Sequence, residues 1–450
     1  MKQRFFGTDG IRGVVGNFPI VADFARDLAE AVDAFMLRRG MQRDRAVLIA
    51  MDTRESGVAL ARALHSGFEA LGRPVVWLGV VPTPFAARCL IKRGGGMAVV
   101  LTASHNPATD NGFKLFSEGG YKLDPEDEAE IESLLAERMV GDAPKVRDSV
   151  LPLVQAPDPI DFANEWKGPS LEGMRIALDT ANGATALFSP LVLRQLGATV
   201  FTIGDSPDGL NINSGVGSEY PENVARLVKE HGCDIGFAHD GDGDRVIAVD
   251  HLGHVLSGEH FMGIISTFCK TEHADKDHPL VTTIQSNLGL DVYLRESLGA
   301  SVIRTDVGDR NVSIAMRENN VWFGGENSGH YVFRHYLPTG DGLVALLKLI
   351  EAVRVSGRNL ADLAGLFRLF PSKMINLRLA GKRPMDQLVH LEAVQQRWKA
   401  NLKGRGRLLV RYSGTESKIR LLAECPETAQ VEQALADLVD AANKDLDVLT

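Results

Sequence analysis

The chain has 450 residues, of which 44% are hydrophobic and 24% are charged, and its formal net charge is −9. This composition is typical of a soluble globular protein, and a prior of about 150 residues per domain suggests about three domains. The acidic balance argues against nucleic acid or an anionic membrane surface as a partner. An acidic protein that binds an anionic ligand must gather its Lys and Arg residues locally.

The cysteines and the apolar segments indicate the compartment. Cys89, Cys233, Cys269 and Cys425 are widely separated and form no CxxC pair, which favours a reducing environment and gives no hint of a zinc site. The opening MKQRFFGTDGIRG lacks the apolar core of a signal peptide, and apolar runs are too short to span a bilayer. We therefore expect a cytoplasmic protein that does not associate with membranes.

The first part of the chain alternates predicted helices and strands. Between residues 20 and 39, apolar residues recur with helical spacing, and Gly40 follows as a stop signal. Ser56 is expected to cap the second helix. In chain order, the elements predicted after the first helix are a strand at 45–52, a helix from 56 to 71, strands at 74–81 and 96–104, and a helix that opens at Asp124-Pro125.

A second alternation begins near Met174 and a third near Ser257. The predicted strands are 175–183, 198–205, 234–242, 279–287, 301–309 and 321–329, and the predicted helices lie near 185–197 and 223–232. Three successive α/β units of similar length look like a weak structural repeat. In each unit one strand runs into a polar, Gly-containing loop, and open α/β folds bind ligands in such loops.

After about Phe370 the pattern changes to a small α+β unit, with helices at 385–402 and 428–445 around strands at 407–414 and 418–425. We therefore predict three similar α/β domains with mixed sheets, followed by a smaller α+β C-terminal domain. The first boundary is expected in the proline-containing stretch that starts near Leu151. The predicted domains are 1–153, 154–255, 256–368 and 369–450.

The sharpest motif is HDGDGDR at 239–245. Asp240, Asp242 and Asp244 are separated only by glycines, which let the backbone curl so that three carboxylates converge. Converging carboxylates need a cation, and all-oxygen ligation favours Mg²⁺ or a similar hard ion. An EF-hand is excluded because the required glycine and glutamate are absent at the sixth and twelfth positions. A solvated acidic turn is the simpler alternative.

The second motif is TASHNP at 102–107, followed by a DNGFK segment. Ser104 ends a predicted buried strand and is well placed to act as a nucleophile or phosphate carrier. The surrounding GxSxG pattern of an α/β-hydrolase is absent. Lys114 could neutralise phosphoryl oxygens or transfer a proton, although an Asn-Pro turn and a solvated lysine explain the same residues.

The third motif is RYSGTES at 411–417, which leads to Arg420. Its guanidinium, hydroxyls and backbone N–H groups suit a phosphate dianion, and the alternative is an ordinary hairpin. The residues that could contact the phosphate are Arg411, Ser413, Gly414, Thr415 and Arg420.

Two further stretches carry candidate site residues. In GGENSGH (324–330), Glu326 and Ser328 can bind sugar hydroxyls, and His330 is either an acid/base group or a structural histidine. Upstream, Asp309 and Arg310 end another strand and offer charged contacts. At the N-terminus, the glycines of FGTDGIRG (6–13) hold Arg12 on a loop.

In this order and at these separations, the five stretches resemble the α-D-phosphohexomutase superfamily over the whole chain. The resemblance implies four domains around a central cleft, each contributing one loop. It implies that Ser104 is a phosphoserine and that Asp240, Asp242 and Asp244 hold Mg²⁺ with a phosphoserine oxygen. Arg12, Lys114, Arg245 and His330 match positions that line the reacting phosphate. Glu326 and Ser328 would hold the sugar, and the RYSGTES loop the distal phosphate.

Asn327 and the segment 307–310 resemble the branch of this superfamily that acts on glucosamine phosphates. The implied reaction interconverts glucosamine 6-phosphate and glucosamine 1-phosphate through a bisphosphate, and supplies UDP-N-acetylglucosamine synthesis. The implied partners are therefore a hexosamine phosphate and the bisphosphate intermediate. The assembly that we consider is a homodimer. Two departures are Ser417, where the family often has proline, and Tyr412, where it often has lysine.

Two alternatives stay open. The first is a phosphoglucomutase or phosphomannomutase of the same superfamily. The second is a catalytically silent sugar-phosphate sensor, against which the intact Ser104 and the three aspartates argue.

Overall fold

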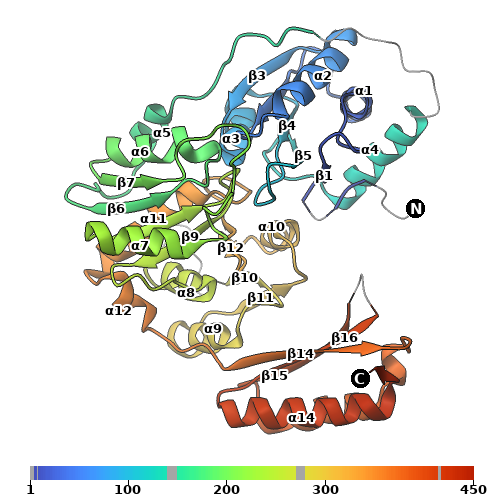
Figure 1. The fold of residues 1–450 in the computed structure, drawn as a ribbon, viewed down its shortest axis with the longest axis vertical. Coiled ribbons are helices and arrows are strands. Elements are labelled where there is room, and N and C mark those ends of the chain that lie inside the picture. The colour runs from blue at the N-terminus through green and yellow to red at the C-terminus, as the bar shows by residue number, and fades with distance from the viewer. Residues whose placement is uncertain (1–4, 8, 139–148, 270–278, 414–416, 450) are drawn as a thin grey trace. The chain divides into compact units, whose positions relative to one another are not determined.

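The computed structural model describes residues 5–7, 9–138, 149–269, 279–413 and 417–449. The chain divides into two compact units (Figure 1). The first unit comprises residues 1–284 and 303–364, and the second comprises residues 285–302 and 365–450.

The first sheet has the strand order β1-β5-β4-β2-β3. Its strands are β1 (Ile11–Val14), β2 (Val47–Met51), β3 (Val75–Val80), β4 (Met97–Leu101) and β5 (Asp110–Ser117). β2 pairs parallel with β3 and β4, whereas β5 pairs antiparallel with β4 and β1. Every residue of β2 and β4 is buried, as expected for continuous apolar strands covered on both faces.

Four helices accompany this sheet: α1 (Ala22–Arg38), α2 (Gly57–Ala70), α3 (Thr83–Arg93) and α4 (Pro125–Arg138). Side chains of α1, α2 and α4 join one apolar core with alternate residues of the strands. Ser56 does not cap α2, contrary to the prediction, because its backbone is already helical and no backbone N–H reaches its side chain. Its hydroxyl instead accepts a hydrogen bond from Asn111 Nδ2 at 2.8 Å.

The second sheet has the order β7-β6-β8-β9. Its strands are β6 (Arg175–Asp179), β7 (Thr199–Ile203), β8 (Ile235–His239) and β9 (Val246–Asp250), and its helices are α5 (Pro159–Glu165), η1 (Ala184–Leu187), α6 (Ser189–Gln195) and α7 (Pro221–His231). The single helix predicted near 185–197 is broken at Phe188, and a new helix begins at Ser189. Pro190, in its first turn, has no N–H to donate to the preceding turn.

The third sheet has the order β11-β10-β12-β13. Its strands are β10 (Leu280–Thr283), β11 (Val302–Thr305), β12 (Phe323–Gly325) and β13 (Tyr331–Phe333), with the helices α8 (Gly258–Phe268), α10 (Asp309–Glu318), α11 (Gly342–Ser356) and α12 (Leu360–Ala364). α11 is capped by Asp341, whose side chain accepts the backbone N–H groups of Leu343 and Val344 at 3.0 Å.

The three sheets share one topology. In each, a central strand has a neighbour on either side, and the later neighbour forms an antiparallel hairpin with the next strand along the chain. The connections of these hairpins contain TASHNP, DGDGDR and ENSGH. The predicted repeat therefore places the three polar loops at equivalent positions.

The second unit contains a sheet of order β15-β16-β14-β17, in which β14 pairs antiparallel with β16 and β17, and β15 pairs antiparallel with β16. Its strands are β14 (Ser372–Leu379), β15 (Arg407–Tyr412), β16 (Lys418–Glu424) and β17 (Val448–Leu449), and its helices are α9 (Leu288–Tyr293), η2 (Leu294–Leu298), η3 (Met385–Gln387), α13 (Val389–Leu402) and α14 (Thr428–Asp445). One face of the sheet forms a core with α13 and α14, so the α+β character is confirmed. β14 and β17 were not predicted.

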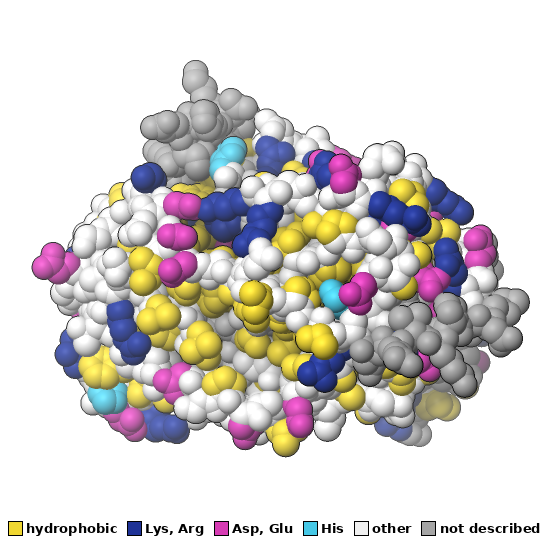
Figure 2. Space-filling model, turned by 90° about the horizontal axis from the view of Figure 1, so that it is seen from above, with side chains coloured by type: hydrophobic (Ala, Val, Ile, Leu, Met, Phe, Trp, Pro, Cys, Tyr) yellow, Lys and Arg dark blue, Asp and Glu magenta, His cyan; other side chains and the backbone are white. Residues whose placement is uncertain are grey.

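Apolar side chains gather among charged ones on the face seen from above (Figure 2). Residues 149–158, which precede α5, also include exposed apolar side chains, with Val150 and Leu153 each 89% exposed. This segment runs beside β3, where Gln155 N donates to Trp77 O at 2.8 Å. Surfaces of this kind suit protein partners, but the homodimer stays a prediction. Among the described residues, no helix has the length and apolarity needed to cross a bilayer.

The packing of α1 generates a stability test within one helix. Leu28 is fully buried in the first core, whereas Leu37 is 37% exposed. We expect Leu28→Ala to lower the free energy of unfolding by about 2–5 kcal/mol, because it removes apolar contacts and leaves a cavity. Leu37→Ala, the matched control, should change it by no more than about 0.5 kcal/mol. Urea denaturation of both variants measures the difference, and equal effects would contradict the assigned packing.

Candidate active site

Ser104 lies in the connection between β4 and β5, and its side chain is fully buried. Its Oγ donates a hydrogen bond to Asp240 Oδ2 at 2.6 Å, so the predicted nucleophile and the predicted metal loop are in direct contact. Its backbone is left-handed, with φ of +52°. For a residue other than glycine this costs about 1–3 kcal/mol, and such strain persists only where the surroundings impose it.

Asp240, Asp242 and Asp244 follow β8 and are each at most 2% exposed. One oxygen from each carboxylate lies within 4.8 Å of the other two. The glycines between them are required, since a Cβ on Gly241 would lie 2.7 Å from Ser104 O and one on Gly243 2.4 Å from Thr185 Cγ2. The curled backbone predicted from the DGDGD spacing is therefore present.

The charges in this loop are incompletely balanced. Burial and the carboxylates of Asp244 and Asp242 raise the pKa of Asp240 well above its ordinary value. Asp242 Oδ1 and Asp244 Oδ1 are buried without a hydrogen-bond partner. Buried carboxylate oxygens without partners are costly, and a hard cation satisfies such oxygens. The residues therefore fit a metal ion.

Lys114, on β5, faces the same carboxylates. Its Nζ donates to Asp242 Oδ2 and Asp244 Oδ2, both at 2.7 Å, and lies 3.1 Å from Asp9 Oδ2. Burial alone would lower the pKa of Lys114, but the three carboxylates outweigh burial and raise it well above its ordinary value. Lys114 is therefore a cation here, and it can donate to a phosphoryl oxygen but not accept a proton.

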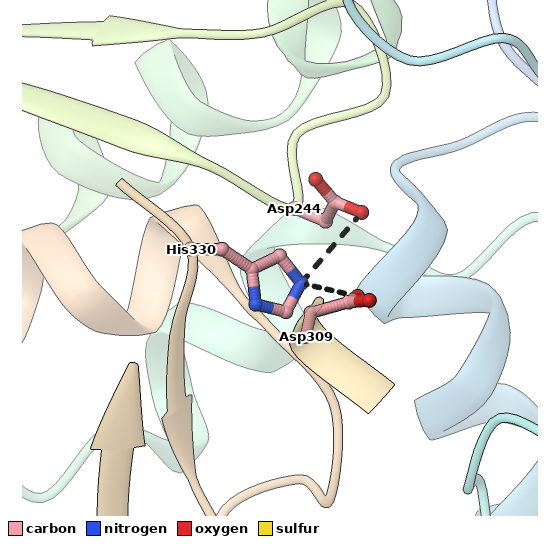
Figure 3. A group of neighbouring side chains, drawn as sticks. All are labelled: Asp244, Asp309 and His330. Carbon is pink, nitrogen blue, oxygen red and sulfur yellow. Dashed lines mark ion pairs between the residues drawn. The ribbon is translucent and has the colours of Figure 1, made fainter. Parts of the chain in front are cut away.

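His330, between β12 and β13, connects the loop to α10. Figure 3 shows its Nε2 directed at two carboxylates, with Asp309 Oδ2 at 3.1 Å and Asp244 Oδ2 at 3.8 Å. Burial lowers the pKa of His330, but Asp309 and Asp244 outweigh burial and raise it. These three residues form a second group that could hold a metal ion, sharing Asp244 with the first. The ion pairs favour a charged role for His330 over a merely structural one.

Arg12 and Lys122 extend the charged network. Asp9 forms ion pairs with Arg12, Lys114 and Lys122, and Lys122 also pairs with Asp309. The sequence analysis missed Asp9, which stands within FGTDGIRG, and Lys122, which no motif marks. It also missed Thr83, whose Oγ1 donates to Asp242 Oδ2 at 2.6 Å. Only the Asp9 position carried a signal that could have identified it.

Arg245 lies beside the serine loop. Its backbone N–H donates to Asp240 Oδ1 at 3.1 Å, and its NH1 lies 3.0 Å from His105 Nδ1. Burial alone would lower the pKa of Arg245, but the carboxylates around it raise the pKa above its ordinary value. The guanidinium is therefore permanently charged and contacts His105, the residue that follows Ser104.

The residues predicted to contact the sugar differ in their exposure and in the partners that they already have. Glu326 is buried, and its Oε1 accepts the backbone N–H of Gly308 at 3.0 Å. Ser328, in the same loop, is exposed. Arg310 forms an ion pair with Glu128, so part of its guanidinium is already occupied. The structure thus brings Asp309 and His330 together but holds Arg310 against α4.

In the second unit, Arg411 on β15 and Arg420 on β16 stand directly opposite each other. Neighbouring side chains at such a position lie on one face of the sheet, and like charges there are destabilising without an anion. Ser413 is 3% exposed, and its Oγ is buried without a hydrogen-bond partner. Lys382 Nζ donates to Ser413 O at 2.7 Å. Gly414 and Thr415 lie outside the described residues.

Comparison with known proteins identifies the family. Models of the phosphoglucomutase/phosphomannomutase family match in four parts: alpha/beta/alpha domain I at residues 3–140, domain II at 158–253, domain III at 257–370 and the C-terminal domain at 374–441. The chain belongs to the phosphoglucomutase/phosphomannomutase family. The resemblance to the α-D-phosphohexomutase superfamily and the expected fold class are thereby confirmed.

Two curated relatives within this family match over nearly their whole length. The phosphoglucosamine mutase of Lawsonia intracellularis is 39% identical over 99% of this chain and 100% of its own. That of Allorhizobium ampelinum is 41% identical over 98% of each chain. Among solved structures, Aspergillus fumigatus N-acetylphosphoglucosamine mutase, in complex with GlcNAc-6P and magnesium, shares the fold. It has a TM-score of 0.61 and 16% identity, over 99% of this chain and 96% of that one.

The carboxylate trio generates a metal-binding test. We expect Mg²⁺ to raise the melting temperature and EDTA to reverse the rise, since an ion that binds only the folded state stabilises it. Asp242→Asn should weaken Mg²⁺ binding by at least about tenfold, because it removes a carboxylate ligand. Thermal unfolding at increasing Mg²⁺ concentrations measures the apparent affinity.

Asp250→Asn is the matched control for this test. Asp250 is also a buried aspartate, but its Oδ1 accepts backbone N–H groups from Leu252 and His254 outside the trio. Its substitution should lower the melting temperature without changing the Mg²⁺ dependence. A Mg²⁺ dependence that survives Asp242→Asn unchanged would refute metal binding at the trio.

Proposed function

We propose that this enzyme is a phosphoglucosamine mutase, which interconverts glucosamine 6-phosphate and glucosamine 1-phosphate through phosphorylated Ser104 and a bisphosphorylated sugar. The observation that carries the proposal is the 2.6 Å hydrogen bond from Ser104 Oγ to Asp240 within the buried carboxylate trio. Relatives that are 39% and 41% identical over nearly the whole chain bear this name, which supports the choice of substrate.

Asp240, Asp242 and Asp244 would hold Mg²⁺ together with an oxygen of phosphorylated Ser104. The unpartnered oxygens of Asp242 and Asp244 and the magnesium complex of the Aspergillus fumigatus enzyme support this assignment. When bound, the ion would supply positive charge to the transferring phosphoryl group. Positioning and charge neutralisation are the main demands of phosphoryl transfer.

The proposed transfer exchanges one oxygen–phosphorus bond for another. The bond between Ser104 Oγ and phosphorus breaks as a sugar hydroxyl oxygen bonds to the same phosphorus. The hydroxyl proton passes to a general base, and the protonated base gives that proton to the leaving serine oxygen, which returns to its hydrogen bond with Asp240. Lys114 at the carboxylate trio, Arg12 beside Asp9 and Arg245 beside His105 would contribute fixed positive charge to the site.

His330 is the better of the two candidate general bases. The pKa of both groups is raised by neighbouring carboxylates. That of Lys114 rises well above an already high ordinary value, whereas that of His330 rises from an ordinary value near neutral pH, so His330 loses its proton more readily than Lys114. Asp309 contacts His330 and would stabilise the imidazolium that forms when it accepts the proton. Glu326 and Ser328 would hold the sugar, and the part of the Arg310 guanidinium that does not pair with Glu128 would add a charged contact.

The second unit would bind the distal, non-reacting phosphate. Arg411 and Arg420 supply the charge, and the unpartnered Oγ of Ser413 is a donor that the phosphate could accept. Gly414 and Thr415 complete the proposed set. Holding the remote phosphate converts binding energy into orientation of the reacting end.

The domain borders at 153, 255 and 368 are proposed with this function, one polar loop to each domain. A cytoplasmic location and a homodimer stay predictions.

A substrate panel tests the proposed function. We expect turnover of glucosamine 6-phosphate to exceed that of glucose 6-phosphate and mannose 6-phosphate, each measured as kcat/KM with a matching bisphosphate activator. Faster turnover of mannose or glucose phosphate would instead make the protein a phosphomannomutase or phosphoglucomutase. Binding without any turnover would favour the sensor alternative.

Ser104→Ala tests the phosphoryl carrier. We expect this variant to lose mutase activity by on the order of 10⁴-fold or more while still binding the sugar phosphate, because only the acceptor oxygen is removed. Ser66→Ala, at a buried serine on α2, is the control and should retain activity. Phosphate detected on Ser104 of the wild-type protein by intact mass would agree, and full activity of Ser104→Ala would exclude Ser104 from the reaction.

A further inference from the structure

A fully buried arginine stands behind the serine loop. Arg54 lies between β2 and α2, and its side chain has no exposed surface. Its Nε donates to Asp52 Oδ2 at 2.9 Å, and Asp52 is itself only 1% exposed. Buried ion pairs are weak evidence for stability, so the other contacts of Arg54 decide what it does.

Those contacts all go to the serine loop. NH2 of Arg54 donates to Ser104 O at 3.0 Å and to Asn106 O at 2.8 Å. NH1 donates to Asp110 O at 2.9 Å and to Pro107 O. A guanidinium has five N–H donors, and these four hydrogen bonds together with that of Nε to Asp52 use all five. The side chain therefore binds four carbonyls of one loop.

The backbone N–H of Ser104 is held, through Thr102, by the ion pair of Arg54 and Asp52. Ser104 N donates to Thr102 Oγ1 at 2.9 Å, and that hydroxyl donates to Asp52 Oδ2 at 2.7 Å. Asp52 Oδ1 accepts Arg54 N at 3.0 Å. Both ends of the strained residue are thus tied to one buried acid–base pair, directly at its carbonyl and through Thr102 at its amide.

A second tether comes from the part of the chain between β7 and α7. Asn213 Nδ2 donates to Ser104 O at 2.8 Å and to Asn106 O at 2.9 Å. These are the two carbonyls that Arg54 NH2 also binds. The loop is therefore held from its own sheet and from the neighbouring one.

We propose that Arg54 is the positioning residue that imposes the left-handed conformation of Ser104 and so directs its Oγ at the carboxylate trio. Without these hydrogen bonds, the serine would relax to an ordinary backbone conformation, and its Oγ would point elsewhere. The inference rests on the proposed phosphoryl transfer through Ser104. It assigns Arg54 no contact with the substrate.

Arg73 provides a matched control in the same domain. It is also a fully buried arginine, its Nε pairs with Asp33, and it donates to the carbonyls of Gln42 at 3.0 Å and Arg45 at 2.9 Å. No contact joins it to the serine loop among the residues described. Arg54→Lys and Arg73→Lys therefore remove similar hydrogen bonds, but only the first releases Ser104.

The experiment follows phosphate transfer from glucosamine 1,6-bisphosphate to dephosphorylated Ser104 in a single turnover, read by intact mass, alongside the melting temperature. We expect Arg54→Lys to slow the transfer by about 10²-fold, since small misplacements of a reacting group cost that much. Arg73→Lys should lower the melting temperature by a similar amount and leave the transfer rate within about twofold of wild type, as expected for a site remote from the reaction.

Equal transfer rates in the two variants would overturn the inference. If Arg54→Lys does not fold, Asn213→Gly decides: glycine keeps the positive φ of 58° at this position and removes the second tether. Slower transfer at an unchanged melting temperature would support positioning, and an unchanged rate would refute it. Failure of the wild-type protein to accept phosphate would instead contradict the proposed function, so the two failures are distinguishable.

Discussion

The balance of charge around three buried carboxylates governs the rest of the first unit. Asp240, Asp242 and Asp244 are almost inaccessible to water, and their mutual repulsion must be offset within the protein. Lys114 supplies one positive charge, and the orphaned oxygens leave room for a cation to supply more. Lys114 belongs to the first sheet and the carboxylates to the second, so this balance also joins the two sheets.

The requirement that buried charges be balanced extends to the third sheet. Asp244 contacts His330, which contacts Asp309, which pairs with Lys122 and through it with Asp9. Acidic and basic groups alternate along this path, so each buried charge has a neighbour of opposite sign. Such a network is costly to assemble but strongly favours one arrangement of its members. A phosphoryl group entering it meets donors that are already oriented, which is the condition for electrostatic stabilisation of a transition state.

Much of the fold and of the candidate site could be predicted from the sequence. Buried strands such as β2 and β8 can be predicted because they are short apolar runs. The DGDGD spacing requires a curled backbone whatever surrounds it. β14 was missed because the exposed Met374 interrupts the alternation of its inward apolar residues with polar outward ones, and only the pairing with β16 and β17 and the packing of Ile375 against the helices define it as a strand. Arg54 was missed because its partners are backbone carbonyls of a distant loop, and carbonyls carry no side-chain signature.

On the C-terminal sheet, the register that sets Arg411 against Arg420 also sets Arg378 against Lys418. Four cationic side chains thus stand on the face opposite the helices, where no apolar core dilutes their field. A surface so charged attracts anions from a distance, and dissolved salt weakens that attraction. An anion that binds to this sheet should therefore associate fastest in dilute buffer, and its rate of association should fall as the ionic strength of the medium rises.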